Sequence, residues 1–204
     1  MIQQVNGLSP FEKGVYSAYT SNGPMIAREA YEIYSTKNRF MIKSDITVFG
    51  VNGFYQTVYM EVTDNWFPLS VKISDSENNL FLADISNNQA TFSTRRTSAS
   101  DIIQTVPIVN GNFFITFAGA LLIPFLWLRS LKPDSKKLSF QILPVGYAEV
   151  EVLENAMISG ASYGKLLLKQ VVNDIETIFY VIYDSNGVLQ SVDHDNLIIR
   201  KSDA

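Results

Sequence analysis

The chain has 204 residues, of which 47% are hydrophobic and 18% are charged. A chain of this length buries roughly 70% of its surface on folding, so a compact core is expected. It has no Cys and a single His, which excludes disulfide frameworks, thiol nucleophiles, thiolate zinc sites and imidazole-rich metal centres. The formal net charge of −4 argues against nucleic-acid binding. We therefore expect no metal, no cofactor and no nucleic-acid partner.

The first half of the chain has the pattern of a series of short strands. Apolar and polar residues alternate, as half-buried strands require, over residues 15–19, 26–34, 40–48, 54–62, 69–74, 80–85 and 90–95. Short polar segments such as Gly50-Val51-Asn52-Gly53 and Ser86-Asn87-Asn88 separate them and have the composition of hairpin turns. Because a parallel crossover needs a dozen or more residues, the strands are expected to pair consecutively as an antiparallel meander.

The end of the chain repeats this pattern. Candidate strands cover residues 138–143, 146–153, 175–183, 188–192 and 197–200. The segment Asp184-Ser185-Asn186-Gly187 is a strong hairpin signal. Residues 165–172 have apolar positions that suit either a short helix or a strand, and we interpret them as a strand.

One uncharged segment, Phe113–Leu128, breaks the strand pattern. It is shorter than the about 20 apolar residues of a membrane helix, and Gly119 and Pro124 interrupt it. We expect it to be partly helical and to pack inside the curve of the sheet as core; alternatively, it is a plug or lid over an apolar cavity. The basic residues that follow, beginning with Arg129 and Lys132, would allow at most a peripheral membrane contact.

One catalytic pattern is present. The segment Gly160-Ala161-Ser162-Tyr163-Gly164 matches the nucleophile elbow of serine hydrolases, and Ser162, then Asp184 or Asp174, and then His194 follow the triad order of that class. An elbow needs a parallel strand before the serine and a helix after it, whereas the surrounding sequence predicts antiparallel strands. Glycines also supply the positive φ angles of hairpins. We therefore interpret the segment as a turn and expect no enzymatic activity, with hydrolysis by Ser162 as an alternative.

Several segments of the chain carry a family resemblance: Gly14-Val15-Tyr16, Asn22–Glu29, Phe40–Ser44, Leu122–Leu131 and Tyr183–Leu189. In these segments the sequence resembles bacterial all-β domains of unknown function. Those domains are similar to the glycolipid-binding spiral β-roll domains and, more distantly, to the periplasmic lipoprotein carriers. The resemblance implies a strongly curved antiparallel sheet around an apolar interior that can hold a lipid or glycolipid tail, without catalysis.

The pattern and the resemblance together predict one all-β domain over residues 1–204. We expect a single large curved antiparallel sheet, a spiral β-roll or half-barrel meander, with the inserted segment on its concave face. The expected function is non-catalytic binding of an apolar or amphipathic ligand of the lipid or glycolipid class. The side chains expected to line the site or to orient a head group are Phe113, Phe117, Leu121, Phe125, Trp127, Arg129, Tyr59 and Arg95.

A second function stays open, that of a structural or protein-interaction module with a filled core and no ligand. The sequence as given opens with no signal-peptide pattern, so a cytoplasmic location is expected, or a periplasmic or extracellular one if a leading segment has been removed. The sequence indicates neither the oligomeric state nor the identity of a ligand.

Overall fold

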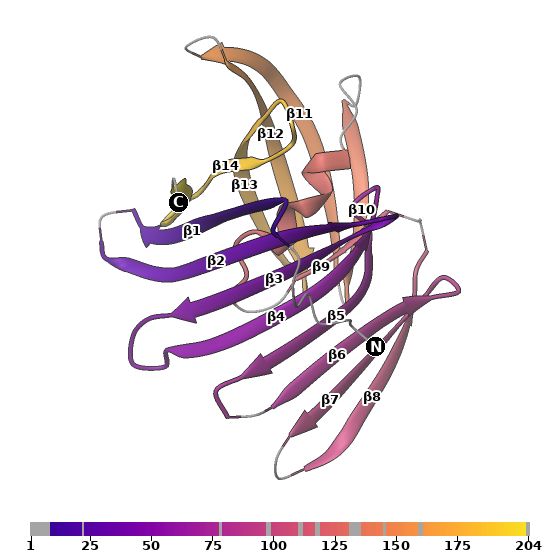
Figure 1. Cartoon of the computed structure of the whole chain (residues 1–204). Helices are drawn as coiled ribbons and strands as arrows, with labels where there is room; N and C mark the ends of the chain where they lie inside the picture. Colours follow the sequence, from indigo (N-terminus) through magenta and orange to yellow (C-terminus); the bar gives the residue numbers. More distant parts are fainter. Residues whose placement is uncertain are drawn as a thin grey trace.

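The computed structural model describes residues 9–21, 23–77, 79–96, 99–109, 112–116, 119–130, 136–144, 146–158 and 161–202. Their strands form one large, curved, unclosed and mostly antiparallel sheet (Figure 1). The first eight strands are β1 (Glu12–Thr20), β2 (Met25–Thr36), β3 (Arg39–Val48), β4 (Phe54–Thr63), β5 (Pro68–Asp75), β6 (Leu80–Ser86), β7 (Gln89–Arg96) and β8 (Ala99–Pro107). The remaining elements are β9 (Phe113–Ile115), the 3-10 helix η1 (Ile123–Ser130), β10 (Lys137–Leu143), β11 (Tyr147–Ile158), β12 (Ala161–Val172), β13 (Ile175–Asp184), β14 (Leu189–His194) and β15 (Leu197–Ser202).

Apart from β8 and β9, strands that follow one another in the chain are also neighbours in the sheet. The order runs from β8 back to β1, continues with β15, and ends at β9, so the first and last strands of the chain pair with each other. In that pair Val15 lies opposite Ser202, and Thr20 lies opposite Leu197. The edges of the sheet are β8 and β9, and among the described residues no ladder of backbone hydrogen bonds joins them.

The two ends of the sheet nevertheless approach each other. Gln141 on β10 donates its Nε2 to the carbonyl oxygen of Pro107 at the end of β8, at 2.9 Å. Its Oε1 accepts from the backbone N–H of Val109, at 3.0 Å. One amide side chain therefore links the two ends, and the sheet is barrel-like without closing.

The inner face of the sheet carries the core. Along β4 every second residue from Gln56 to Val62 is buried, and the residues between them are partly exposed, as the two-residue period of a strand requires. The helix η1 lies inside the curve, between the β1–β5 part and the β10–β14 part of the sheet (Figure 1). Its residues from Ile123 to Leu128 are all buried, and so is the whole of β9. The uncharged segment thus contributes to the core and is partly helical, as predicted.

Residues with positive φ angles make the tight hairpins. Asn87 and Asn88, between β6 and β7, have φ angles of 52° and 57°. Asn173 and Asp174, between β12 and β13, have φ angles of 51° and 63°. Two successive residues of this kind make a turn whose twist matches the right-handed twist of the strands, and Asn and Asp tolerate that conformation best after glycine.

The fold class predicted from the sequence is confirmed, with three differences of detail. β8 was not predicted, because its adjacent apolar residues Ile102 and Ile103 break the alternation and are both exposed on an edge strand. β9 pairs with β10 in parallel rather than antiparallel. Residues 161–164, expected in a turn, belong to β12 and pair with β11, so that hairpin is longer than the apolar pattern indicates.

Candidate functional site

An apolar cavity of about 380 Å³ lies between the inner face of the sheet and the inserted segment. The sheet contributes residues from β1–β4, β12, β13 and β15, and the other wall comes from Thr116 and from residues within 119–125. The described residues that line the cavity are Ala18, Ile26, Ala27, Val48, Phe49, Phe54, Thr116, Gly119, Ala120, Leu121, Pro124, Phe125, Gln170, Phe179, Leu197 and Ile199. Phe49 lines the cavity and is 45% exposed, so the cavity meets solvent where the β3–β4 hairpin begins.

Small residues set the width of this cavity. Ala18 on β1 and Ala27 on β2 leave open space at the floor of the cavity, because their side chains end at the β carbon. Gly119 brings the inserted segment close to the sheet: a β carbon there would lie 2.8 Å from Cγ2 of Val48. The φ angle of Gly119 is +78°, in the region where only glycine is free of strain. The segment therefore contacts β3 directly at one side of the cavity.

A buried carboxylate fixes the inserted segment to the sheet. Glu29 on β2 is fully buried, and its Oε2 accepts from the backbone N–H groups of Leu121 and Leu122, the latter at 2.7 Å. Its Oε1 accepts from the hydroxyl of Ser44 on β3. Burial raises the pKa of Glu29, whereas these three donors act in the opposite direction. The carboxylate satisfies two backbone donors just before η1, much as a capping residue does.

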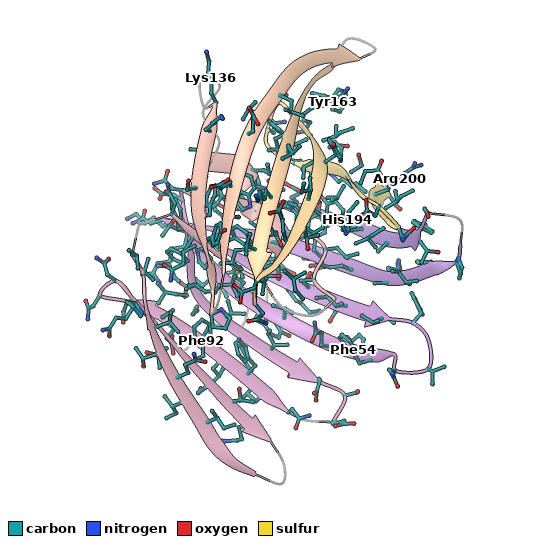
Figure 2. All side chains as sticks on the ribbon, turned by 180° about the vertical axis from the view of Figure 1, so that it is seen from behind. Phe54, Phe92, Lys136, Tyr163, His194 and Arg200 are labelled. Carbon is teal, nitrogen blue, oxygen red and sulfur yellow. The ribbon has the colours of Figure 1, made fainter. Side chains whose placement is uncertain are left out.

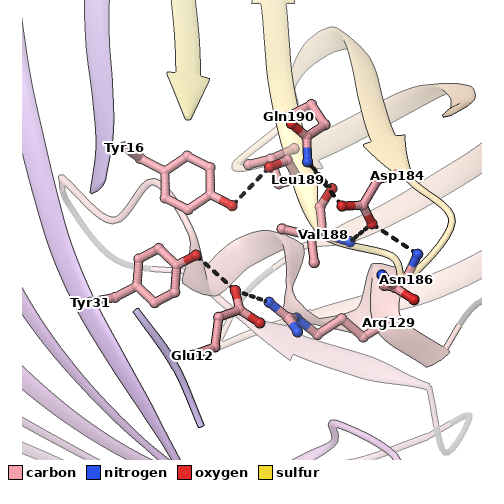
Figure 3. Close-up of polar contacts among 9 residues, drawn as sticks. All are labelled: Glu12, Tyr16, Tyr31, Arg129, Asp184, Asn186, Val188, Leu189 and Gln190. Atoms are coloured by element: carbon pink, nitrogen blue, oxygen red, sulfur yellow. Dashed lines mark hydrogen bonds and ion pairs between the residues drawn. The ribbon is translucent and has the colours of Figure 1, made fainter. Parts of the chain in front are cut away.

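A second polar cluster holds the far end of η1. Oε1 of Glu12 accepts from Nη2 of Arg129 at 2.7 Å and from the hydroxyl of Tyr31 at 2.8 Å (Figure 3). The Arg129 guanidinium also lies 4.5 Å from the centre of the Trp66 ring, a cation–π contact. Burial alone would raise the pKa of Glu12, but Arg129 and Tyr31 hold it below its ordinary value. The start of η1 is thus attached to β2 through Glu29, and its end is attached to β1 through Glu12.

The β13–β14 turn packs on the same end of η1 (Figure 3). Oδ1 of Asp184 accepts from the backbone N–H groups of Asn186 and Val188, at 2.9 and 3.0 Å, which closes the turn. A β carbon on Gly187 would lie 2.5 Å from the carbonyl oxygen of Leu128, so only glycine fits there. Asp184 therefore has a turn-forming role in this structure.

Two of the residues predicted to bind a ligand, Leu121 and Phe125, line the cavity. Phe113 and Trp127 are buried but are not among its lining residues. Trp127 packs against Phe140, with ring centroids 4.7 Å apart, and its Nε1 donates to the carbonyl oxygen of Pro124. Phe117 falls outside the described residues.

The three residues predicted to orient a head group lie elsewhere. The Arg129 side chain is only 6% exposed and is engaged by Glu12. Tyr59 alternates with the inward-facing Val58 and Met60 on β4, so it points to the outer face. Arg95 is exposed on β7. None of the three lines the cavity.

The residues of the alternative serine-hydrolase site do not come together. Ser162 belongs to β12, so a strand follows it where an elbow has a helix. Nδ1 of His194 donates to the carbonyl oxygen of Ile178, at 2.8 Å. From the β13–β14 register, His194 lies opposite Phe179, five residues from Asp184, or roughly 17 Å along the strand. Figure 2 shows His194 well separated from Tyr163, the residue after Ser162.

Three polar residues that matter at this site, Glu29, Ser44 and Gln170, were not predicted. The signal for Glu29 is its place in the inward-facing set of β2, between Ala27 and Tyr31. Ser44 likewise interrupts the buried face of β3. A carboxylate and a hydroxyl at inward positions of adjacent strands are a recognisable sign of a buried polar contact. Gln170 is likewise a polar residue at an inward-facing position, at the end of β12, and it lines the cavity.

The fold and the cavity define an all-β protein whose open, barrel-like sheet wraps around an internal apolar segment. Among the described residues, no helix is long and apolar enough to cross a membrane. Within the same parts of the chain, no three His, Asp or Glu side chains gather as a metal site would require.

Comparison with known proteins supports the fold and assigns no family or function. No protein-family model matches the sequence, and no curated protein matches it significantly. Among solved structures, the crystal structure of a β-barrel-like protein of the domain of unknown function DUF1849 from Brucella abortus is similar, with a TM-score of 0.61. The match covers 93% of this chain and 94% of that chain at 9% sequence identity. This chain therefore shares its fold with an all-β protein of unknown function.

Proposed function

We propose that this protein binds the apolar part of a lipid or glycolipid, without catalysis, in the cavity between the sheet and the inserted segment. The observation that carries the proposal is the cavity itself: it is open at Phe49, lined almost wholly by apolar side chains, and about 380 Å³ in volume. Sites for small ligands have volumes of about 300–1,000 Å³ and are mostly apolar with a few polar groups.

The energetics suit an alkyl chain. Each methylene group transferred from water to an apolar site contributes about 0.8 kcal/mol, so a chain with ten buried methylenes would gain about 8 kcal/mol. This gain corresponds to roughly micromolar affinity before the cost of ordering the chain is subtracted. The wall formed by residues 119–125 is held in place by Glu29, so little of the binding energy is needed to order the site.

The family resemblance supports the same ligand class. The bacterial all-β domains of unknown function that the sequence resembles are themselves similar to the glycolipid-binding spiral β-roll domains and, more distantly, to the periplasmic lipoprotein carriers, and that resemblance implies a curved sheet around an apolar interior. In this chain the tail would enter between Phe49 and Phe54, and a polar head group would stay at the mouth of the cavity. Figure 2 labels Phe54 at the start of β4.

A titration with Nile red, an uncharged solvatochromic dye, tests the proposal. We expect saturable fluorescence enhancement with the wild-type protein and at least a tenfold weaker affinity for Ala27→Phe, because the ring would occupy the cavity. The matched control is Ala30→Phe on the outer face of the same strand, which should bind as the wild type does. Ala120→Phe, on the opposite wall, repeats the test if Ala27→Phe fails to fold. Equal affinity in folded inner and outer variants would contradict the proposal.

The structure also offers a specific observation for the second function, a protein-interaction module. The edge strand β8 exposes Ile102 and Ile103, at 62% and 70%, beside unpaired backbone groups. Exposed apolar edge strands pair readily with other chains. Sedimentation of the wild type and of Ile103→Lys would separate the two functions: an oligomer that dissociates in the variant supports the interaction module.

A further inference from the structure

The cavity lining contains two polar side chains and no charged one among the described residues. The polar side chains are Thr116, after β9, and Gln170, on β12. The sequence between Ile102 and Leu128 has no Asp, Glu, Lys, Arg or His at all, so the wall from the inserted segment is uncharged throughout.

Both polar side chains are free to contact a ligand. Within the described parts of the chain, neither Thr116 nor Gln170 has a hydrogen-bond partner for its side chain. Gln170 continues the inward-facing set of Leu166 and Leu168, whereas its neighbour Lys169 faces outward and pairs with Glu176 at 2.7 Å. The strand thus presents an amide to the cavity and keeps its cation on the other face.

Two ionisable groups of the described residues contact cavity-lining residues, and both already have hydrogen-bond partners. Behind Leu121, Glu29 is a carboxylate that already has three hydrogen-bond donors. Behind Phe179, the His194 ring packs on the phenyl ring, with centroids 4.9 Å apart, and its Nδ1 is engaged by Ile178. An anion placed in the cavity would lose its hydration without gaining a cation, which is strongly unfavourable.

We infer that the cavity selects uncharged amphipathic lipids, with a hydroxyl, ester or amide group next to the alkyl chain, over lipids with a carboxylate at that position. This inference rests on the proposed function and names its ligand class. The Gln170 amide and the Thr116 hydroxyl each supply a donor and an acceptor, which match an ester or hydroxyl group and leave a carboxylate without a counter-ion.

Calorimetric titration with two ligands of equal chain length tests the inference: dodecanoic acid and its glycerol monoester, each below its critical micelle concentration. At about pH 8, where the acid is ionised, we expect the ester to bind at least tenfold more tightly. Near pH 4 the acid is protonated and the difference should shrink to less than threefold. Equal or tighter binding of the ionised acid would overturn the inference while leaving the proposed function intact. Binding of neither ligand would refute the proposed function and the inference with it.

Two substitutions of Gln170 test whether this polar side chain of the cavity determines the selectivity. Gln170→Lys places an ammonium group at the cavity and should raise the affinity for the ionised acid at least tenfold. Gln170→Leu removes the amide and should weaken ester binding about tenfold without improving acid binding. Lys169→Gln, on the outer face of the same strand, is the matched control and should change neither affinity. A Gln170→Lys protein that is folded and still prefers the ester to the same degree would overturn the inference.

Discussion

Removal of the Glu29 carboxylate should detach the inserted segment from the sheet. In Glu29→Ala the backbone N–H groups of Leu121 and Leu122 lose the buried carboxylate that accepts from them. Each orphaned buried donor costs about 1–3 kcal/mol, so we expect a loss of about 4 kcal/mol in the free energy of unfolding. This is a large part of the about 5–15 kcal/mol that a typical domain has.

The isosteric variant Glu29→Gln separates the hydrogen bonds from the charge. Its carbonyl oxygen can still accept from Leu121 and Leu122, and its amide can donate to the hydroxyl of Ser44. We therefore expect its free energy of unfolding to lie within about 1 kcal/mol of the wild type.

Burial raises the pKa of Glu29, so ionisation of this group costs stability as the pH rises above its unfolded value of 4.5. The free energy of unfolding of Glu29→Gln, compared with that of the wild type, should therefore increase as the pH rises above 4.5.

Urea unfolding followed by tryptophan fluorescence measures these differences, because Trp127 lies in the segment that Glu29 holds. Glu32→Ala on the outer face of β2 is the control, since among the described residues it removes a carboxylate that accepts a hydrogen bond from Tyr34, and it should cost less than about 1 kcal/mol. The reasoning is refuted if Glu29→Ala costs no more than Glu32→Ala, or if Glu29→Gln is as unstable as Glu29→Ala.

Three further predictions concern the anchoring of the inserted segment. Arg129→Met leaves the Glu12 carboxylate without its cation and should lower the free energy of unfolding by about 3 kcal/mol; a loss below about 1 kcal/mol in urea unfolding would contradict this. Because the pKa of Glu12 is lowered, its contribution to the free energy of unfolding should disappear as the pH falls below 4.5. In Glu12→Gln the free energy of unfolding should therefore depend less on pH in this range. Gly119→Ala should lower the melting temperature more than Gly50→Ala does, because both have positive φ but only Gly119 faces a neighbour, Val48. Equal shifts would mean that the contact at Val48 relaxes freely.

The sequence predicts the strands well because their inner faces are periodic. Residues 57–62 alternate between outer positions and apolar inner ones, and β4 spans Phe54–Thr63. The hairpin turns follow from Asn, Asp and Gly at positions with positive φ. β8 lacks such a signal, because an edge strand with two adjacent exposed isoleucines obeys no single burial pattern.

The site is less predictable than the fold because it depends on distant pairings. Periodicity places Glu29 and Ser44 on inner faces, but only the fold brings Leu121, 92 residues away, to the carboxylate. Arg129 looks like a surface cation in the sequence and becomes a buried partner of Glu12, 117 residues away. Whether an apolar segment fills a core or leaves a cavity depends on the shapes of side chains, which the sequence pattern does not record.

Native mass spectrometry of the purified protein, followed by organic extraction of what it releases, tests the central claim most directly. We predict that the wild type, as purified or after incubation with the glycerol monoester, carries one bound lipid, and that Ala27→Phe carries none under the same conditions. An unliganded mass for the wild type after incubation, or an equal lipid load on Ala27→Phe, would contradict a ligand-binding cavity and would favour the interaction module.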